Sequence, residues 1–221
     1  MRARLVDAAV VVLSLCAAIT TGLVVRRELF PPRPQTPGPA EIRDWREYAR
    51  EGHRIGEPGA PVTIVVFSDF QCPFCGVLME RVRAVQALRP REVAVVYRHW
   101  PLPKHPYALS AARASDCAAE QGKFPAFHDA LFAKQDSIGV IPWEQFAAAA
   151  GVGDLTRFRA CAADTGALAS VARDTMAGRR LQVSGTPTLL VNDLRFYGAI
   201  PKDTLDAYVR RALAARPRAG S

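Results

Sequence analysis

The sequence predicts an α/β fold, because two strand-like runs flank a segment with helical periodicity. Residues 61–67 read PVTIVVF and residues 92–100 read EVAVVYRHW, and both are rich in β-branched side chains, as is typical of strands buried on both faces. Between them Val77, Leu78 and Val82 recur at helical spacing. A strand, a helix and a strand of these lengths form a right-handed βαβ unit with parallel strands.

The remaining segments predict helices around this unit and a hairpin near its end. Residues 41–51 indicate a short surface helix that leads into the first strand. Alanine-rich segments predict five further helices, at residues 107–121, 124–135, 142–150, 155–163 and 168–181. Two strands at 188–191 and 194–197 form the hairpin, and residues 201–215 predict the closing helix.

Composition indicates an ordinary globular protein. Of the 221 residues, 49% are hydrophobic and 23% are charged, which excludes a disordered or collagen-like chain. The net charge of +8 comes mainly from arginines. These arginines are scattered, and no stripe alternates them with aromatic side chains as a nucleic-acid groove would. We therefore do not expect nucleic acid as a partner.

The apolar run at residues 8–25 indicates a membrane anchor or a signal within residues 1–30. It contains no charged side chain, and a helix of this length spans roughly 27 Å, enough for the core of a bilayer. A cleaved signal peptide and a lipoprotein signal at Cys16 are the alternatives. The run is longer than the apolar h-region of a usual signal peptide, and Leu15 before the cysteine is not small. We expect an uncleaved single-pass anchor.

A proline-rich segment separates this region from the folded part. Residues 31–40 read PPRPQTPGPA, with proline at every second position on average, and predict an extended, semi-rigid linker. We expect one folded domain over residues 41–215 and a tail over residues 216–221.

Cys72-Pro73-Phe74-Cys75 is the strongest chemical motif of the chain. It lies where the first predicted strand gives way to a helix. Unpaired N–H groups and the dipole at a helix N-terminus stabilise a thiolate on Cys72, and Pro73 fits the first turn because it has no N–H to lose. Cys75, one turn further, is expected to be more buried. A zinc knuckle and an inert structural disulfide are the alternatives, although zinc needs two more nearby ligands.

The segment from Gly52 to Cys75, GHRIGEPGAPVTIVVFSDFQCPFC, together with GTPT at residues 185–188, resembles the DsbA-like thioredoxin-fold thiol–disulfide oxidoreductases of bacterial envelopes. The resemblance covers residues 52–215. It implies a thioredoxin-like fold with a helical domain inserted over about residues 105–182. It also implies that Cys72 and Cys75 are the catalytic pair and that neither a cofactor nor a metal is needed.

The same resemblance assigns the residues that support the cysteine pair. Pro187 is expected to be cis and to lie against the catalytic disulfide, with the backbone of Thr186 free to pair with the extended chain of a client. Pro73 and Phe74 complete the active-site surface. Similar proteins often carry an extra cysteine pair, so a structural disulfide between Cys117 and Cys161 is expected in an oxidising envelope, with two independent buried thiols as the alternative.

Two departures from the family leave the direction of the reaction open. Phe74 stands where the strongest oxidants of the family have histidine, and Thr186 stands where they have valine. We expect a dithiol oxidase that acts on reduced or unfolded client proteins and passes electrons to a quinone-linked membrane partner. The expected location is the bacterial inner membrane, with the domain facing the periplasm or cell exterior. The alternatives are a reductase or isomerase of the same fold, and a tethered chaperone or assembly module without catalysis.

Overall fold

The computed structural model describes residues 2–29, 38–166 and 168–215. The chain divides into two compact units, Met1–Gly38 and Pro39–Ser221. Most of the predicted linker and all of the predicted tail, residues 216–221, lie outside the described residues.

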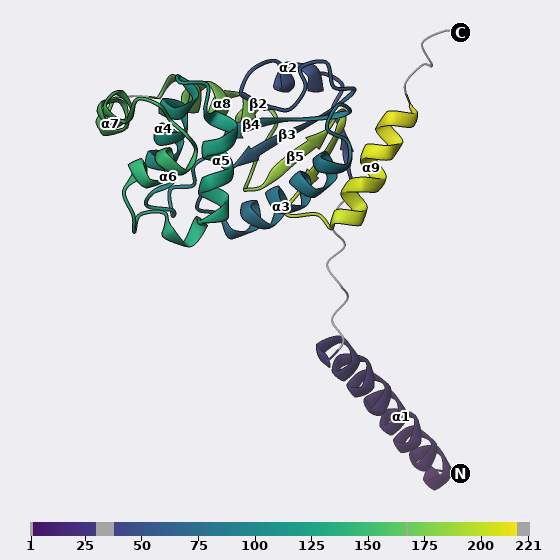
Figure 1. Ribbon diagram of the computed structural model, residues 1–221. Helices are drawn as coiled ribbons and strands as arrows, with labels where there is room; N and C mark the ends of the chain where they lie inside the picture. Colours follow the sequence, from purple (N-terminus) through teal and green to yellow (C-terminus); the bar gives the residue numbers. More distant parts are fainter. Residues whose placement is uncertain (1, 30–37, 167, 216–221) are drawn as a thin grey trace, which may run out of the picture. The chain divides into compact units, whose positions relative to one another are not determined.

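The first unit contains one helix, α1 (Arg2–Leu29), which includes the apolar run predicted to be an anchor (Figure 1). Side chains of this helix are described for residues 13–26, and all of them are exposed. Within the described part of the chain, no helix combines the length and hydropathy required to cross a bilayer. The structure therefore does not confirm the membrane span predicted over residues 8–25.

A six-stranded mixed sheet forms the centre of the second unit (Figure 1). Its strands in chain order are β1 (Ala40–Glu41), β2 (His53–Ile55), β3 (Val62–Ser68), β4 (Val93–His99), β5 (Thr188–Val191) and β6 (Leu194–Tyr197). Across the sheet they follow the order β1-β6-β5-β3-β4-β2. Strands β3 and β4 are parallel and every residue of both is buried, which confirms the predicted βαβ unit. The other neighbouring pairs are antiparallel.

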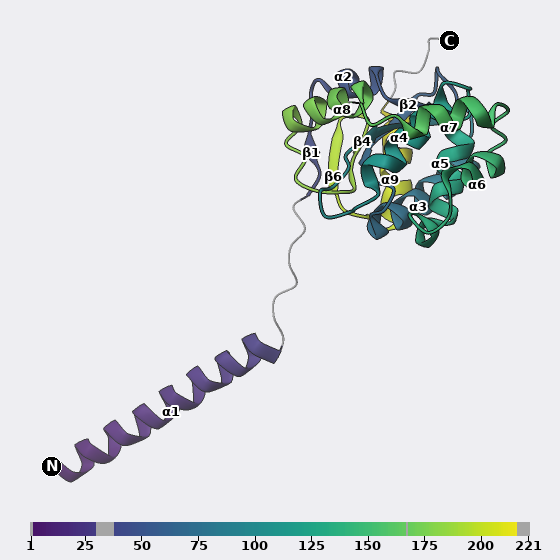
Figure 2. The same cartoon turned by 90° about the vertical axis from the view of Figure 1, so that its left-hand side faces the viewer.

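Helices cover both faces of the sheet (Figures 1 and 2). These helices are α3 (Pro73–Leu88) and α9 (Lys202–Ala214) on one face, and α2 (Trp45–Arg50) and α8 (Ala169–Arg180) on the other. Side chains of β3 alternate between the two faces, as successive residues of a strand must. Ile64 and Val66 pack with Leu78 of α3, whereas Val65 and Phe67 pack against α2 and α8. The alternation fixes α3, and with it the cysteine pair, on one face of the sheet.

Four helices between β4 and α8 form the helical insertion, whereas α8, which the prediction included in the insertion, packs on the sheet. They are α4 (Ala108–Ala119), α5 (Phe124–Ala133), α6 (Trp143–Ala149) and α7 (Leu155–Ala163). Phe127, Phe146 and Phe158 are fully buried at their centre. A disulfide joins Cys117 of α4 to Cys161 of α7, with Cα atoms 5.8 Å apart, so these cysteines are not independent thiols.

Two short strands are absent from the sequence prediction. Strand β2 pairs with β4 at one edge of the sheet, and β1 pairs with β6 at the other. With three and two residues, they are too short to show the period-two alternation that identifies a strand. The helix predicted over 41–51 consequently begins only at Trp45, after β1. The helix predicted over 124–135 ends at Ala133, and residues 135–137 form a separate 3₁₀ turn, η1 (Gln135–Ser137).

Candidate active site

The two cysteines of the CPFC motif lie at the start of α3. Cys72 is the N-cap residue and Pro73 occupies the first turn, where its missing N–H costs no hydrogen bond. The backbone oxygen of Cys72 accepts hydrogen bonds from the N–H groups of Cys75 at 2.9 Å and Gly76 at 3.2 Å, which closes the first turn. The motif therefore lies at the positive end of a helix dipole, as the sequence predicts.

The two thiols differ in exposure. Both are free, Cys72 is 4% exposed and Cys75 is completely buried. Phe74 between them is 66% exposed and projects its ring to the surface. An incoming sulfur can therefore reach Cys72, while Cys75 is accessible only through Cys72.

Thr186 and Pro187 lie against the Cys72 thiol. The Thr186–Pro187 peptide bond is cis, and Cys72 Sγ donates a hydrogen bond to the backbone oxygen of Thr186 at 3.5 Å. Strand β5, which follows Pro187, pairs with β3 and places Thr188 opposite Phe67. That register carries residues 186 and 187 to the end of β3 from which the CPFC turn departs. Residues far apart in sequence thus form one site.

Hydrogen bonds stabilise the thiolate of Cys72. The largest contribution comes from the Cys75 thiol, and the N–H groups of Cys75 and Phe74 add to it, so that the pKa of Cys72 falls from its ordinary value of 9.0 to about 5 despite the opposing effect of burial. Burial raises the pKa of Cys75, and its hydrogen bond to Cys72 raises that pKa further. Each of the groups that lower the Cys72 pKa is a neutral donor. The pKa of Cys72 is therefore lowered by neutral hydrogen-bond donors, although Phe74 stands where the strongest oxidants of the family have histidine.

Reduced protein is expected to titrate Cys72 with a midpoint near pH 5 instead of near 9. Because this pKa is lower in the folded state, the thiolate stabilises the reduced fold fully above the unfolded pKa, and that stabilisation is lost as pH falls through about 5. Thiolate absorbance of the reduced chain against pH measures the midpoint, with the oxidised chain as baseline. In Cys72→Ser the step near pH 5 is expected to vanish, since the pKa of Cys75 is raised. A wild-type midpoint near 9 would contradict the assignment.

Asp69 stabilises the turn that precedes Cys72. Its carboxylate is buried and accepts hydrogen bonds from the backbone N–H groups of Gln71 and Leu102 and from His105 Nδ1, each at 2.8 Å. These contacts link the turn before Cys72 to the segment that follows β4. The observed contacts give Asp69 a structural role, since one closes the turn at Gln71 and two fix that turn to Leu102 and His105.

Gln135 is a functional residue that the sequence does not indicate. Its side-chain Nε2 donates to the backbone oxygens of Phe70 at 2.7 Å and Cys72 at 2.9 Å. The side chain lies so close to Gly76 that a β-carbon there would meet Gln135 Oε1 at 2.6 Å. A residue of the insertion thus holds the active-site turn, through contacts 65 and 63 residues apart in sequence that have no local pattern.

Two cavities are lined by residues that neighbour Cys72. One of about 440 Å³ is lined by α3 and the end of α5, including Pro73, Val77 and Phe132. The other, of about 270 Å³, is lined by Thr186, Pro187 and neighbouring residues up to Gly198. Both cavities therefore offer surface next to residues of the site.

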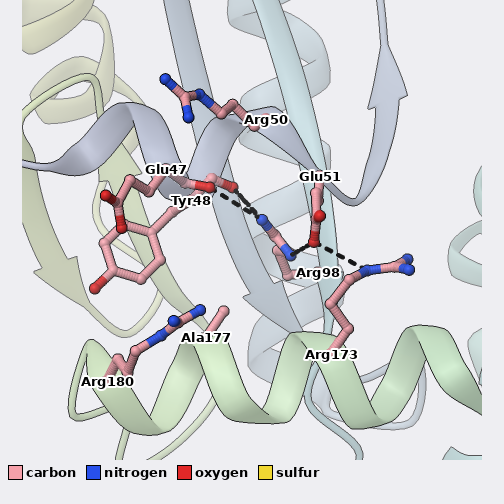
Figure 3. Close-up of a pocket in the computed structure, with 8 residues that line it drawn as sticks. All are labelled: Glu47, Tyr48, Arg50, Glu51, Arg98, Arg173, Ala177 and Arg180. Carbon is pink, nitrogen blue, oxygen red and sulfur yellow. Dashed lines mark hydrogen bonds and ion pairs between the residues drawn. The ribbon is translucent and has the colours of Figure 1, made fainter.

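A further pocket lies between α2 and α8 and does not include the cysteines. It has a volume of about 220 Å³, and Figure 3 shows its eight lining residues, among them Arg98, Arg173 and Glu51. Glu51 lies 3.2 Å from the Arg173 guanidinium and 4.0 Å from that of Arg98. Glu51 is thus paired with two of the arginines of the pocket.

Comparison with known proteins places the chain in a family. The sequence model of the thioredoxin family matches residues 49–211. Among curated proteins, a Na⁺/H⁺ antiporter NhaA 3 of Salinispora tropica is 40% identical over 172 residues, which is 76% of this chain and 26% of that protein. An NhaA antiporter of Herminiimonas arsenicoxydans is 31% identical over 70% of this chain and 24% of its own length. The chain thus spans about a quarter of the length of these relatives.

Solved structures share the whole folded unit. A thioredoxin-like oxidoreductase from Silicibacter pomeroyi is 29% identical, with a TM-score of 0.65, over 79% of this chain and 99% of that one. A periplasmic thioredoxin-like protein from Salmonella enterica serovar Typhimurium is 26% identical, with a TM-score of 0.61, over 80% and 99% of the two chains. The thiol–disulfide exchange protein α-DsbA2 from Wolbachia pipientis, 20% identical with a TM-score of 0.62 over 76% and 91%, shares the fold.

These matches confirm the thioredoxin-like α/β fold that the CPFC and GTPT motifs predict. The family match runs from residue 49 to residue 211 and so covers strands β2 to β6, the helical insertion and the cysteine turn together. The chain therefore belongs to the thioredoxin family, and its fold is that of the DsbA-like thiol–disulfide oxidoreductases.

Proposed function

We propose that the chain is an envelope oxidoreductase that oxidises dithiols of client proteins through Cys72 and Cys75. The observation that supports this most is the asymmetry of the pair: Cys72 has a pKa lowered to about 5, while Cys75 is buried and its pKa is raised. A thiol with a low pKa is a good leaving group, so it is released readily at the end of an exchange. A low pKa also favours the reduced form of the pair, which makes its disulfide an oxidant.

The reaction transfers two electrons from client to enzyme in two exchanges. A client thiolate attacks Cys72 Sγ of the Cys72–Cys75 disulfide, forming a mixed disulfide while Cys75 leaves and takes up a proton. The second client thiolate then attacks the client sulfur of the mixed disulfide and releases Cys72 as the thiolate. The client gains a disulfide, and the enzyme is left with one thiolate and one thiol.

The surface around Cys72 suits an extended, unfolded client. The Thr186 backbone lies beside the thiol and can pair with a client strand, in the manner of added β-strands. The exposed ring of Phe74 and the cavity lined by Val77 and Phe132 offer apolar contacts of low specificity. Such a surface fits many sequences, as an enzyme acting on diverse reduced clients requires.

Turnover needs an acceptor for the two electrons, and the envelope provides the setting. We propose a quinone-linked membrane protein as the acceptor and the periplasm or cell exterior as the location. The Cys117–Cys161 disulfide supports an oxidising compartment, since structural disulfides are rare in the cytosol. Anchoring through residues 8–25 remains a prediction from the sequence.

The redox potential of the full chain in glutathione buffers tests the direction. We expect a value between about −120 and −270 mV and nearer the first, since a pKa of about 5 lies between the roughly 3.5 of strong oxidants and the 7 of reducing members of the fold. Oxidised chain should also introduce disulfides into a reduced model protein. A Cys16→Ser chain serves as the control for the third free thiol. A potential near −270 mV with insulin reduction alone would indicate a reductase, and inertness in both assays a non-catalytic module.

A further inference from the structure

A cluster of His53, His99 and Asp116 lies outside the active site described above. His53 belongs to β2, His99 ends β4 and Asp116 lies in α4, so three elements converge on one point. Within the described residues it is the one group of three or more histidine, cysteine, aspartate or glutamate side chains whose ligand atoms lie close enough to share a metal ion. We propose that this histidine–aspartate cluster binds a divalent transition-metal ion of the Zn²⁺ type.

The positions of the ligand atoms fit such an ion. His53 Nε2 lies 2.7 Å and His99 Nε2 lies 3.1 Å from the same oxygen, Asp116 Oδ1, and all the ligand atoms are within 4.8 Å of one another. Tetrahedral zinc with bonds of about 2.0–2.1 Å sets its ligands roughly 3.3 Å apart. Opening each contact by a few tenths of an ångström, within reach of side-chain rotation, admits the ion.

Neighbouring side chains hold Asp116 and His53 in place, as outer partners of a metal site do. Ser170 Oγ donates a hydrogen bond to Asp116 Oδ2, the oxygen that faces away from the histidines. The ring of His53 stacks on Phe124 with centroids 3.8 Å apart, which fixes its orientation. His99 is 1% exposed, whereas the side chains of His53 and Asp116 are 19% and 18% exposed. The cluster is thus buried at His99 and partly exposed to solvent at His53 and Asp116.

The donor set determines the class of metal. Two imidazole nitrogens and one carboxylate oxygen suit Zn²⁺ or Cu²⁺, and the absence of thiolate from the three ligands disfavours Cu⁺. Three protein ligands leave one position of a tetrahedron for water. An ion bound here joins β2 and β4 of the sheet to α4 of the insertion and so stabilises the junction between them.

Zn²⁺ binding to the full chain tests this site. Because free thiols also bind Zn²⁺, the chain carries Cys16→Ser and its Cys72–Cys75 pair is oxidised beforehand. Calorimetric titration is expected to give one Zn²⁺ per chain, and thermal unfolding is expected to shift upward with Zn²⁺ and return with a chelator. Co²⁺ in place of Zn²⁺ should give the visible absorption of a tetrahedral site without a sulfur charge-transfer band.

Matched variants identify the ligands. His53→Gln keeps a donor to Asp116 but is a poor metal ligand, and Asp116→Asn keeps the shape of the carboxylate. Each is expected to lower the Zn²⁺ affinity at least tenfold and to remove the thermal shift, while circular dichroism shows that each remains folded. Asp129→Asn, which alters a separate histidine–carboxylate pair with His128, is expected to bind as the wild type. The proposal is overturned if the wild type binds no Zn²⁺, or if both cluster variants bind it with unchanged affinity.

Discussion

Replacing Cys72 by serine is expected to abolish disulfide exchange, with a fall in rate on the order of 10³-fold or more. Cys72 Sγ is attacked by the client thiolate in the first exchange and leaves as the thiolate in the second, and a serine oxygen can form neither the Cys72–Cys75 disulfide nor the mixed disulfide. Cys75 cannot substitute, because it is completely buried and its pKa is raised. Disulfide formation in a reduced model protein, followed by acid quenching and thiol labelling, measures the rate.

Cys75→Ser is the matched change at the second sulfur, and its expected result is different. Cys72 stays nucleophilic in this variant, so it attacks a client disulfide, but no partner thiol resolves the product. The mixed disulfide should therefore accumulate and appear as a reductant-sensitive adduct on a gel. Cys72→Ser should give no adduct, and Cys16→Ser should behave as the wild type. Wild-type exchange by Cys72→Ser would remove the basis of the assignment.

Asp174→Asn is expected to destabilise the fold by about 3–5 kcal/mol, because it breaks a buried ion pair at one partner. Arg98 Nη1 lies 2.8 Å from Asp174 Oδ1, and both residues are at most 1% exposed. Asp174 Oδ2 also accepts a hydrogen bond from the His99 N–H at 2.8 Å. The neutral amide removes the buried partner of the Arg98 charge, which then keeps the backbone oxygen of Tyr48 and the carboxylate of Glu51 at 4.0 Å. Urea unfolding of the oxidised chain measures the change.

Glu51→Gln is the control for this ion pair, because Glu51 faces the same guanidinium from the solvent side (Figure 3). Its side chain is 58% exposed and 4.0 Å from Arg98, so a change of about 0–1 kcal/mol is expected. A double replacement, Arg98→Met with Asp174→Leu, should be less destabilised than Asp174→Asn, since it leaves no unpaired charge. Equal losses for Asp174→Asn and Glu51→Gln would show that burial of the pair is not the cause.

Most of the fold could be predicted because its signals are local. The valine-rich runs of β3 and β4 and the alanine-rich helices appear within two residues of the predicted bounds, since each depends on the periodicity of its own segment. Strands β1 and β2 could not be predicted, because they become strands by pairing with β6 and β4 at the edges of the sheet and not through a pattern in their own sequence. The contacts that create them lie tens of residues away.

The residues of the site also divide into those that a local motif identifies and those that only the packing brings together. Cys72 and Pro187 could be identified because each lies in a short motif, CPFC and GTPT. Gln135 and the histidine–aspartate cluster could not, because their members come together only when the insertion packs on the sheet. The bond between His53 and Asp116 spans 63 residues, and neither neighbourhood suggests the other. A single sequence indicates the reacting atoms but not the side chains that hold them in place.

The two hydrogen bonds of Gln135 have a consequence for how this protein can diverge. The side-chain amide of Gln135, which belongs to the insertion, donates to the backbone oxygens of Phe70 and Cys72. Replacing the insertion by that of a relative would therefore disturb the turn that carries Cys72. A chimaera would have to import a donor of the same reach together with a glycine at position 76, which leaves room for it. We therefore expect the insertion and the redox centre to be exchangeable only as a single unit.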